Sequence, residues 1–310
     1  MDIELRSKVD LLSENYREVK KVLRWYGRRL NIVEALLYGR TDKEIDLKKV
    51  KEVRRYLDLV TSREINFTKK FKNIFSILIN ENKEYKKVYG DTLEVYKHLI
   101  SKGFLEEEIT LFSSFMLANR FCDEELDSKL QRLLEVKNAL NGDDYIGYAL
   151  LATTSKPIDV IKNEFNLVSE NIRQAGNCNE DMIKSLTFSL ILEDKEIEKK
   201  VEKAFEIVCN IKSEMSFLPF DAYPLLGLAA MLIDDSENFS KEIKDVYDMV
   251  NEKKTFKFFL NKELKLLFSI GIVLDRYIEE VKADLIDISI NDEMNILLTL
   301  EECIVFSVCR

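Results

Sequence analysis

Short apolar blocks recur along the chain at nearly constant intervals. Six of them begin at Phe75, Phe115, Tyr148, Phe188, Leu228 and Phe268, so the intervals between them are 40, 33, 40, 40 and 40 residues. A second set of apolar blocks precedes the first set one by one, ending at Val60, Leu99, Leu140, Val168, Ile211 and Val250. Each repeating unit therefore holds two apolar segments joined by a short polar one, and a repeat of this length is typical of stacked supersecondary units.

The spacing within a unit favours helices over strands. In the fifth unit, apolar residues recur at positions i, i+3, i+4, i+7 and i+10, which places them on one helix face. These residues are Val201, Ala204, Phe205, Val208 and Ile211, and the charged residues Glu202, Lys203 and Glu206 take the other face.

Residues that begin and end helices stand at the expected places between the apolar blocks. Short polar side chains cap helix N-termini, and glycine is favoured just after a helix ends. The predicted N-caps are Asp143, Asn179 or Asp181, Asp221 and Asn261, and the predicted stops are Gly103, Gly142 and Gly176.

Breakers of regular structure are scarce, with 9 Gly and 3 Pro in 310 residues. Sandwiches, barrels and collagen need them far more often. The pattern predicts an all-α fold, an α/α solenoid of about six helical hairpins with a period near 40 residues. We expect a single domain over residues 1–310, with a basic N-terminal cap at 1–45, hairpin repeats at 46–284 and an apolar C-terminal cap at 285–310. The consensus residues of tetratricopeptide, HEAT and armadillo repeats are absent.

The composition fits amphipathic helices around a core, since 46% of residues are hydrophobic and 33% are charged. The longest run without a charged residue is 12 residues, at 222–233. A membrane-spanning helix needs about 20 apolar residues. We therefore expect no membrane span and a cytoplasmic protein.

Five cysteines form an odd set without a C-x-x-C pair: Cys122, Cys178, Cys209, Cys303 and Cys309. This usage argues against a disulfide framework and against a structural zinc site. We expect reduced thiols that are mostly buried as small hydrophobic side chains.

Four stretches of the chain resemble a family of uncharacterised bacterial proteins known only as a domain of unknown function. They are KVLRW from Lys21 to Trp25, residues 36–46, VYKHLISKGF from Val95 to Phe104, and DDYIGYALLA from Asp143 to Ala152. The resemblance implies an all-helical fold. It implies no known reaction, cofactor or catalytic residue.

Catalytic and cofactor motifs are missing from the sequence. It contains no G-x-G-x-x-G, no G-x-x-x-x-G-K-[ST] and no G-x-S-x-G, so no phosphate loop or nucleophile elbow is expected. Glu94 and His98 share a helix face, but a metal site would need further ligands and there is no second histidine. We expect no metal and no cofactor. An enzyme remains an alternative, with Asp143 and Asp144 as the best paired carboxylates.

Charge is distributed unevenly along the chain. Residues 1–100 hold 23 Lys or Arg and 16 Asp or Glu, a net charge of +7, whereas residues 101–310 hold 24 and 40, a net charge of −16. The basic part carries a helical ridge at i, i+3, i+4, i+7 and i+11, made of Arg17, Lys20, Lys21, Arg24 and Arg28. Such a ridge could bind nucleic acid, anionic lipid or an acidic protein. The overall pI of about 5.1 argues against a dedicated nucleic-acid binder.

The basic ridge has simpler interpretations. Lys and Arg are good helix formers, and a basic end can meet the acidic end of another copy. The apolar C-terminal helix offers a second route to a homo-oligomer, because a terminal apolar segment needs cover.

The predicted function is the binding of a protein or peptide, without catalysis. Helical repeats leave an extended concave surface for recognition. The candidate residues for that surface are Tyr96, Asp143, Asp144, Tyr145, Tyr148, Tyr223 and Tyr247, and the tyrosines fit the core equally well. The alternatives are a nucleic-acid-associated factor that uses the basic ridge and an enzyme with an unrecognised site.

Overall fold

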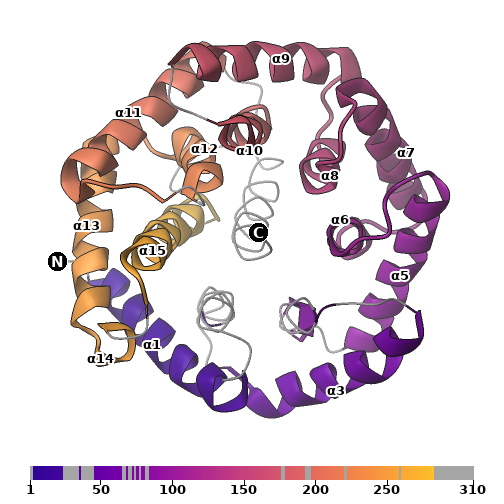
Figure 1. The fold of residues 1–310 in the computed structure, drawn as a ribbon, viewed down its shortest axis with the longest axis horizontal. Helices are drawn as coiled ribbons and strands as arrows, with labels where there is room; N and C mark the ends of the chain where they lie inside the picture. Colours follow the sequence, from indigo (N-terminus) through magenta and orange to yellow (C-terminus); the bar gives the residue numbers. More distant parts are fainter. Residues whose placement is uncertain are drawn as a thin grey trace. The chain divides into compact units, whose positions relative to one another are not determined.

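A computed structural model describes most of the chain. The described residues are 3–23, 35, 45–64, 68, 72, 75–76, 78–80, 84–175, 179–192, 197–219, 222–257 and 260–282. They form helices and no strand (Figure 1), which confirms the predicted all-α fold.

From α5 (Tyr85–Ser101) to α12 (Tyr223–Leu232) a long helix alternates with a shorter one. In the first half the helices are α1 (Ile3–Leu23), α3 (Leu47–Glu64), α5 (Tyr85–Ser101), α6 (Glu108–Ala118), α7 (Asp123–Leu140) and α8 (Tyr145–Thr153). In the second half they are α9 (Ile158–Ala175), α10 (Glu180–Leu190), α11 (Ile197–Met215), α12 (Tyr223–Leu232), α13 (Ser236–Glu252), α14 (Lys254–Lys257) and α15 (Lys262–Lys282).

The chain divides into two compact units. The middle unit is the continuous stretch Val50–Glu170, and the terminal unit combines Met1–Lys49 with Asn171–Arg310.

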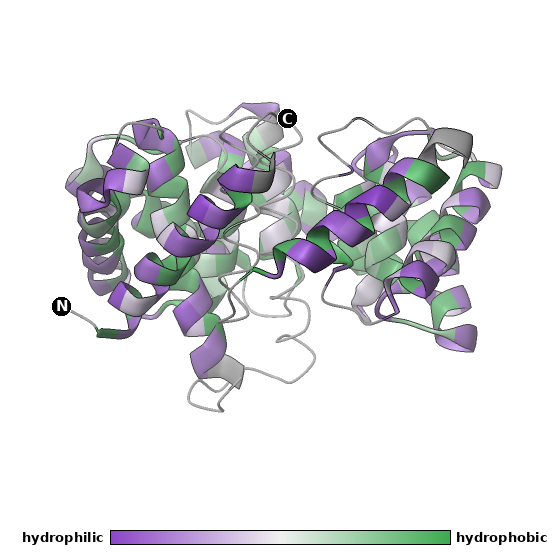
Figure 2. Cartoon of the chain, turned by 90° about the horizontal axis from the view of Figure 1, so that it is seen from below, coloured by the Kyte–Doolittle hydropathy of each residue, from purple (hydrophilic) through white to green (hydrophobic). Residues whose placement is uncertain are grey.

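In the middle unit, α5 pairs with α6 and α7 pairs with α8, while α6 also packs against α8. The two short helices are apolar on every side, so both must be enclosed. Every residue is buried from Thr110 to Leu117 in α6 and from Tyr145 to Ala152 in α8. The long helices instead have a polar outer face, seen as purple stripes beside green ones in Figure 2.

The terminal unit repeats this arrangement. Here α11 packs against α12 and α13, α12 packs against α10 and α15, and α13 packs against α15. The face predicted for α11 is confirmed at Val201, Ala204, Val208 and Ile211, which are buried. Phe205 is half-buried, and Ile207 takes its place in the core.

Helices α10 and α12 approach each other closely at Gly227. A Cβ atom at this position would lie 2.4 Å from the Cβ of Ser189. The Ser189 hydroxyl also donates a hydrogen bond across the contact to the Pro224 carbonyl at 3.2 Å. Only glycine allows these two backbones to come so near.

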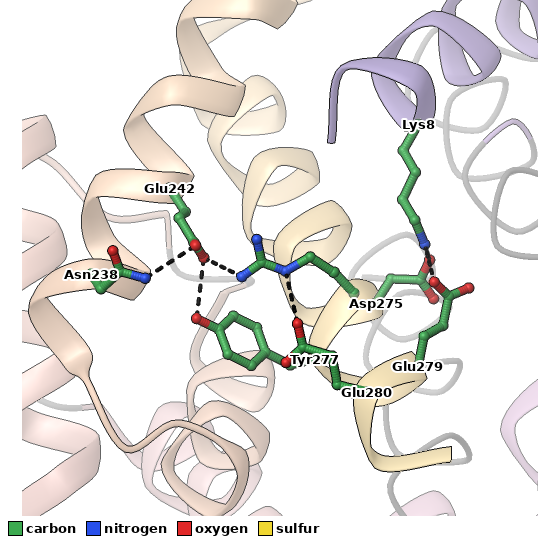
Figure 3. Close-up of polar contacts among 8 residues, drawn as sticks. Lys8, Asn238, Glu242, Asp275, Tyr277, Glu279 and Glu280 are labelled. Carbon is green, nitrogen blue, oxygen red and sulfur yellow. Dashed lines mark hydrogen bonds and ion pairs between the residues drawn. The ribbon is translucent and has the colours of Figure 1, made fainter. Parts of the chain in front are cut away.

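The first helix packs against the last described helices of the chain, α13, α14 and α15. The Lys8 ammonium donates to Asp275 and to Glu279, each at 2.8 Å, and Figure 3 shows it reaching both carboxylates on α15. Farther along α1, the Ser13 hydroxyl donates to Thr255 at 3.0 Å and the Tyr16 ring lies 5.5 Å from the Phe256 ring. Helix α1 is therefore packed into the terminal unit through its contacts with α13, α14 and α15.

A second polar cluster joins α13 to α15. The Arg276 guanidinium donates to Glu242 at 2.6 Å, and the Tyr277 hydroxyl donates to the same carboxylate oxygen at 3.2 Å. Asn238 completes the group around Glu242 (Figure 3). Because Glu242 accepts three bonds, its charge is well satisfied away from bulk water.

Helix ends follow the predicted chemistry with one shift. Asn179 and Asn261 cap α10 and α15 by accepting from the amides of Met182 and Leu264, at 3.0 and 2.9 Å. The cap of α8 is Asp144, which accepts from Gly147 at 3.2 Å, and not the predicted Asp143.

The predicted glycine stops give a mixed result. Gly103 has a φ of +84° directly after α5, as a helix stop requires. At the end of α7 the left-handed residue is Asn141, one position before Gly142. Asp221 and Gly176 lie outside the described residues.

The cysteines differ from expectation. Cys122 and Cys209 are free thiols as predicted, but both are exposed. Cys122 holds the N-cap position of α7, and Cys209 lies on the outer face of α11 with Glu202 and Glu206. The other three cysteines fall outside the described residues. None of the described helices is both long and apolar enough to cross a bilayer.

Candidate functional site

The hairpin turns of the middle unit lie side by side. Phe104, in the turn after α5, contacts Tyr145 at the start of α8, with ring centroids 4.7 Å apart. Lys137 of α7 lies over the Phe104 ring at 4.8 Å and donates to the Gly103 carbonyl at 3.3 Å. Aromatic and cation–π contacts of this kind fix the two turns against each other.

Carboxylates gather on these joined turns. Glu106 and Glu107 follow Phe104, and Asp143 and Asp144 precede Tyr145. Glu106, Glu107 and Asp143 are exposed, whereas Asp144 is half-buried and caps α8. We call these four acids the acidic turn edge. Its exposed charges favour a cationic ligand.

Aromatic side chains form the floor beneath the acidic turn edge. Tyr96, Tyr145 and Tyr148 are buried, and the rings of Tyr145 and Tyr148 lie 6.5 Å apart. The Tyr148 hydroxyl fills the space beside Gly142, where an added Cβ would come within 2.5 Å of it. Gly142 thus leaves room for a buried tyrosine in the turn.

The Tyr96 hydroxyl has no hydrogen-bond partner although it is fully enclosed. Burial, together with the smaller effects of the Glu106 and Glu107 carboxylates, raises the pKa of Tyr96 to about 12. Both effects disfavour the phenolate, so this tyrosine stays neutral at physiological pH.

Tyr148 shows the same behaviour beside the second pair of acids. Burial, and after it the negative charge of Asp144, raises the pKa of Tyr148 to about 12. A backbone hydrogen bond with Asp144 opposes the shift. Neither tyrosine is therefore poised for proton transfer near neutral pH, because a general base or acid needs a pKa closer to the working pH.

Two of the predicted surface residues belong to the terminal unit. Tyr223 is buried at the start of α12, and Tyr247 is half-buried on α13, with its ring 6.3 Å from Phe217. Four of the five predicted tyrosines are thus core residues, because the short helices that carry or contact them are enclosed on every side. Asp143 is the one exposed residue of the predicted surface set.

The described part of the basic ridge is mixed in charge. Arg17 and Lys21 are exposed and Lys20 is half-buried, but exposed Glu14 and half-buried Glu18 interrupt the same face. Lys21 also pairs with Glu18. Arg24 and Arg28 lie outside the described residues, so nucleic-acid binding by the ridge stays a hypothesis.

Within the described ranges, no three His, Cys, Asp or Glu side chains are grouped so that they could hold a metal ion. Glu94 and His98 are exposed on α5. Sequence reasoning missed the contact of Phe104 with Tyr145 and the role of Lys137. The sequence signal for this contact was an aromatic residue, Phe104, directly after Gly103 in the turn that follows α5.

Comparison with curated proteins and with solved structures gives no match. One family matches over residues 15–303, nearly the whole chain, and its description is "Protein of unknown function (DUF4003)". The acidic turn edge, its aromatic floor and the surrounding helices all lie inside this match. The chain belongs to the DUF4003 family.

Proposed function

We propose that this protein is a helical-repeat module that binds a protein or peptide and that its hairpins stack as a solenoid of about six units. Support comes from the contacts inside each unit, where short helices meet the next short helix, as α6 meets α8 and α10 meets α12. Modules built this way present a row of equivalent turns and helix faces, which suits an extended ligand.

The binding region in this proposal is the acidic turn edge. The observation that carries it is the 4.7 Å contact between Phe104 and Tyr145, which joins the two successive turns that bear these carboxylates. A partner segment with lysine or arginine side chains complements such an edge. The buried rings below give the edge a rigid base, which limits the entropy lost on binding.

Exposed charges act mainly on the rate of association and on partner choice. Three exposed carboxylates attract a basic segment over roughly a Debye length, about 8 Å at physiological salt. We therefore expect fast, salt-sensitive binding of modest affinity.

The test uses a fluorescent peptide of alternating lysine and serine, with a glutamate and serine peptide as the opposite-charge control. We expect the triple variant Glu106→Gln, Glu107→Gln, Asp143→Asn to bind the lysine peptide about tenfold more weakly, a loss of about 1.4 kcal/mol. The matched control is Glu202→Gln with Asp245→Asn, two exposed acids of the terminal unit. Equal affinity in both variants would exclude the acidic turn edge as the binding region.

A further inference from the structure

A lysine-rich turn joins α13 to α15 in the terminal unit. Residues 253–265 hold five lysines and one glutamate, a net charge of +4, although residues 101–310 as a whole carry −16. Three of these lysines are exposed: Lys254 and Lys257 on the one-turn helix α14, and Lys262 at the start of α15 (Figure 1). We call these three residues the lysine patch.

The lysine patch has no carboxylate partner among the described residues. Within those residues two of its lysines form no ion pair, and the third, Lys262, lies over the Phe217 ring at 4.7 Å. The one glutamate of the turn, Glu263, is exposed and pairs with none of them. The acid Asp10 of α1 is already paired with Lys253. The positive charge of this surface is therefore left without a counter-charge.

A buried lysine adds to the positive charge behind the patch. Lys265 is 7% exposed, and its ammonium donates to the Asn251 side chain, a neutral acceptor, at 2.7 Å. Burial lowers the pKa of Lys265, and the charge of Lys257 lowers it as well. The two ammonium groups are thus close enough to repel each other, and a negative surface opposite the patch relieves that repulsion.

The backbone presents the lysine patch on a fixed turn. The amides of Phe256 and Lys257 donate to the Lys253 carbonyl at 2.9 and 3.0 Å, and Asn261 caps α15. The two lysines of α14 are three residues apart, so they share one face of the helix. Lys262 stands in the first turn of α15, where the helix dipole disfavours a positive charge. Helix stability therefore does not explain a lysine at this position.

The acidic turn edge has the opposite charge and the same number of exposed groups. Its exposed acids, Glu106, Glu107 and Asp143, form no ion pair with any described residue. The cations at the ends of α5 and α7, Lys102 and Lys137, pair with none of them, and Lys137 donates to a backbone carbonyl instead. Three exposed carboxylates in the middle unit thus match three exposed lysines in the terminal unit.

Both surfaces also carry apolar groups beside their charges. Leu105, in the acidic turn, is 49% exposed. Its carbonyl accepts from the Glu107 amide at 2.9 Å and from the Thr110 hydroxyl at 2.7 Å, which fixes the turn that bears it. On the other surface, the Phe217 ring beneath Lys262 is half-buried. Specific protein interfaces combine an apolar centre with a polar and charged rim.

We propose that the lysine patch of one copy of this chain docks on the acidic turn edge of a second copy. The proposal rests on the proposed function, because it takes the acidic turn edge as a binding surface and names its partner. Since the two surfaces differ, the contact is head-to-tail, and a pair of copies keeps one free surface of each kind. Nucleic acid matches the patch less well, because the chain is acidic overall, with a pI of about 5.1.

The first test is sedimentation velocity of the full chain over a range of concentrations. Salt is set at about 0.01 M and about 1 M, where the Debye length is about 30 Å and about 3 Å. We expect self-association at low salt that weakens at least about tenfold at high salt. The patch variant, Lys254→Gln with Lys257→Gln and Lys262→Gln, should lose it. Association that persists in this variant, or wild-type protein that stays monomeric, overturns the proposal.

A matched control separates the lysine patch from net charge. The variant Lys51→Gln with Lys162→Gln and Lys212→Gln removes three exposed lysines elsewhere and should associate like the wild type. Leu105→Ser changes no charge and should weaken association about fivefold through lost apolar contact. An unchanged affinity in Leu105→Ser means that charge attraction alone acts between copies, which rules out the docked contact.

Mixing two variants tests the contact itself. The patch variant keeps its acidic turn edge, and the triple variant of that edge described above keeps its lysine patch, so each alone should be monomeric. An equimolar mixture should form a dimer and nothing larger, because one matched pair of surfaces remains. The absence of this dimer defeats the proposal.

The outcomes also separate this proposal from the proposed function. If the lysine peptide binds the acidic turn edge but copies do not associate, the proposed function stands and the second copy is not its partner. If the mixed dimer forms although the peptide does not bind, the contact between copies stands without the peptide. A labelled oligonucleotide that binds monomeric wild type and not the patch variant assigns the patch to nucleic acid and overturns the proposal.

Discussion

The Lys8 ammonium lies 2.8 Å from the Asp275 carboxylate, and both side chains are less than one-tenth exposed. This ion pair joins α1 to α15 across 267 positions of sequence. Glu279 shares the ammonium at 2.8 Å from a more exposed position. The short distance between the charges and the second carboxylate, Glu279, together offset the desolvation cost of burying the pair.

We expect Lys8→Met to destabilise the protein by about 3 kcal/mol, because it leaves the Asp275 charge buried without its ammonium. The measurement is the free energy of unfolding in urea. The double variant Lys8→Met with Asp275→Leu should recover much of the loss. Lys241→Met is the control, since Lys241 and Glu237 form an exposed pair at 3.8 Å. A loss no greater than in that control would show that the buried pair is unimportant.

Stability should fall at high pH through the same lysine. Burial lowers the pKa of Lys8, but the combined effect of Asp275 and Glu279 outweighs burial, so the pKa is raised above 10.5. A raised lysine pKa contributes stability that is complete below the unfolded value and disappears as the pH rises through the folded value. We expect unfolding free energies measured above pH 10.5 to decline less steeply in Lys8→Met than in the wild type.

Two helical glycines should respond in opposite directions to alanine. At Gly227 the new Cβ would meet Ser189 at 2.4 Å, so Gly227→Ala should cost about 1–3 kcal/mol through overpacking. At Gly90, in α5, nothing lies within 4 Å, so Gly90→Ala should stabilise by about 0.5–1 kcal/mol. Thermal unfolding of both variants gives the comparison. Partial rescue of Gly227→Ala by Ser189→Gly would locate the clash, and two changes of equal sign would contradict it.

Removing a tyrosine hydroxyl should matter only where it is bonded. Tyr96→Phe takes away an enclosed hydroxyl without a partner, so we expect no loss or a gain of up to about 1 kcal/mol. Tyr85→Phe breaks a 2.8 Å bond to Glu52 and should cost about 1 kcal/mol. Denaturant unfolding measures both. A clear destabilisation by Tyr96→Phe would reveal a partner for its hydroxyl.

Absorbance titration should detect the two tyrosines above the acid pairs. Burial raises the pKa of Tyr96 and of Tyr148 to about 12, so their phenolates form later than those of exposed tyrosines. Since the unfolded chain loses these protons near pH 10, the associated stability is present below pH 10 and is lost between about pH 10 and 12. Substituting both with phenylalanine should remove the latest part of the absorbance change.

Much of the fold followed from sequence because its signals are local. Apolar spacing on α11 depends on helix geometry alone, and it located the buried residues Val201, Ala204 and Ile211 correctly. Caps at Asn179 and Asn261 are equally local. Asp144 displaced Asp143 because adjacent acids compete for one cap, and only the backbone angles decide which carboxylate reaches the amide.

The candidate site was only partly predictable because burial is a tertiary property. A tyrosine on an apolar helix has the same sequence signature whether its ring faces solvent or another helix, so Tyr96 and Tyr148 could not be assigned to the core. The contact between Phe104 and Tyr145 joins different hairpins, which repeat spacing does not encode. The docking of α1 on α15 depends on contacts between the ends of the chain, and no local pattern reports them.

The position of α1 also affects the order in which the chain folds during synthesis. The middle unit is one continuous stretch, so all its helices are available once residue 170 has left the ribosome. Helix α1 is made before the middle unit, yet its partners α13, α14 and α15 are made after it. Until then the part of α1 that packs on them lacks these partners, among them the Phe256 ring that contacts Tyr16. Because domains generally fold as units during synthesis, the middle unit can fold while this part of α1 still waits for its partners, so the terminal unit closes only after α15 has been made.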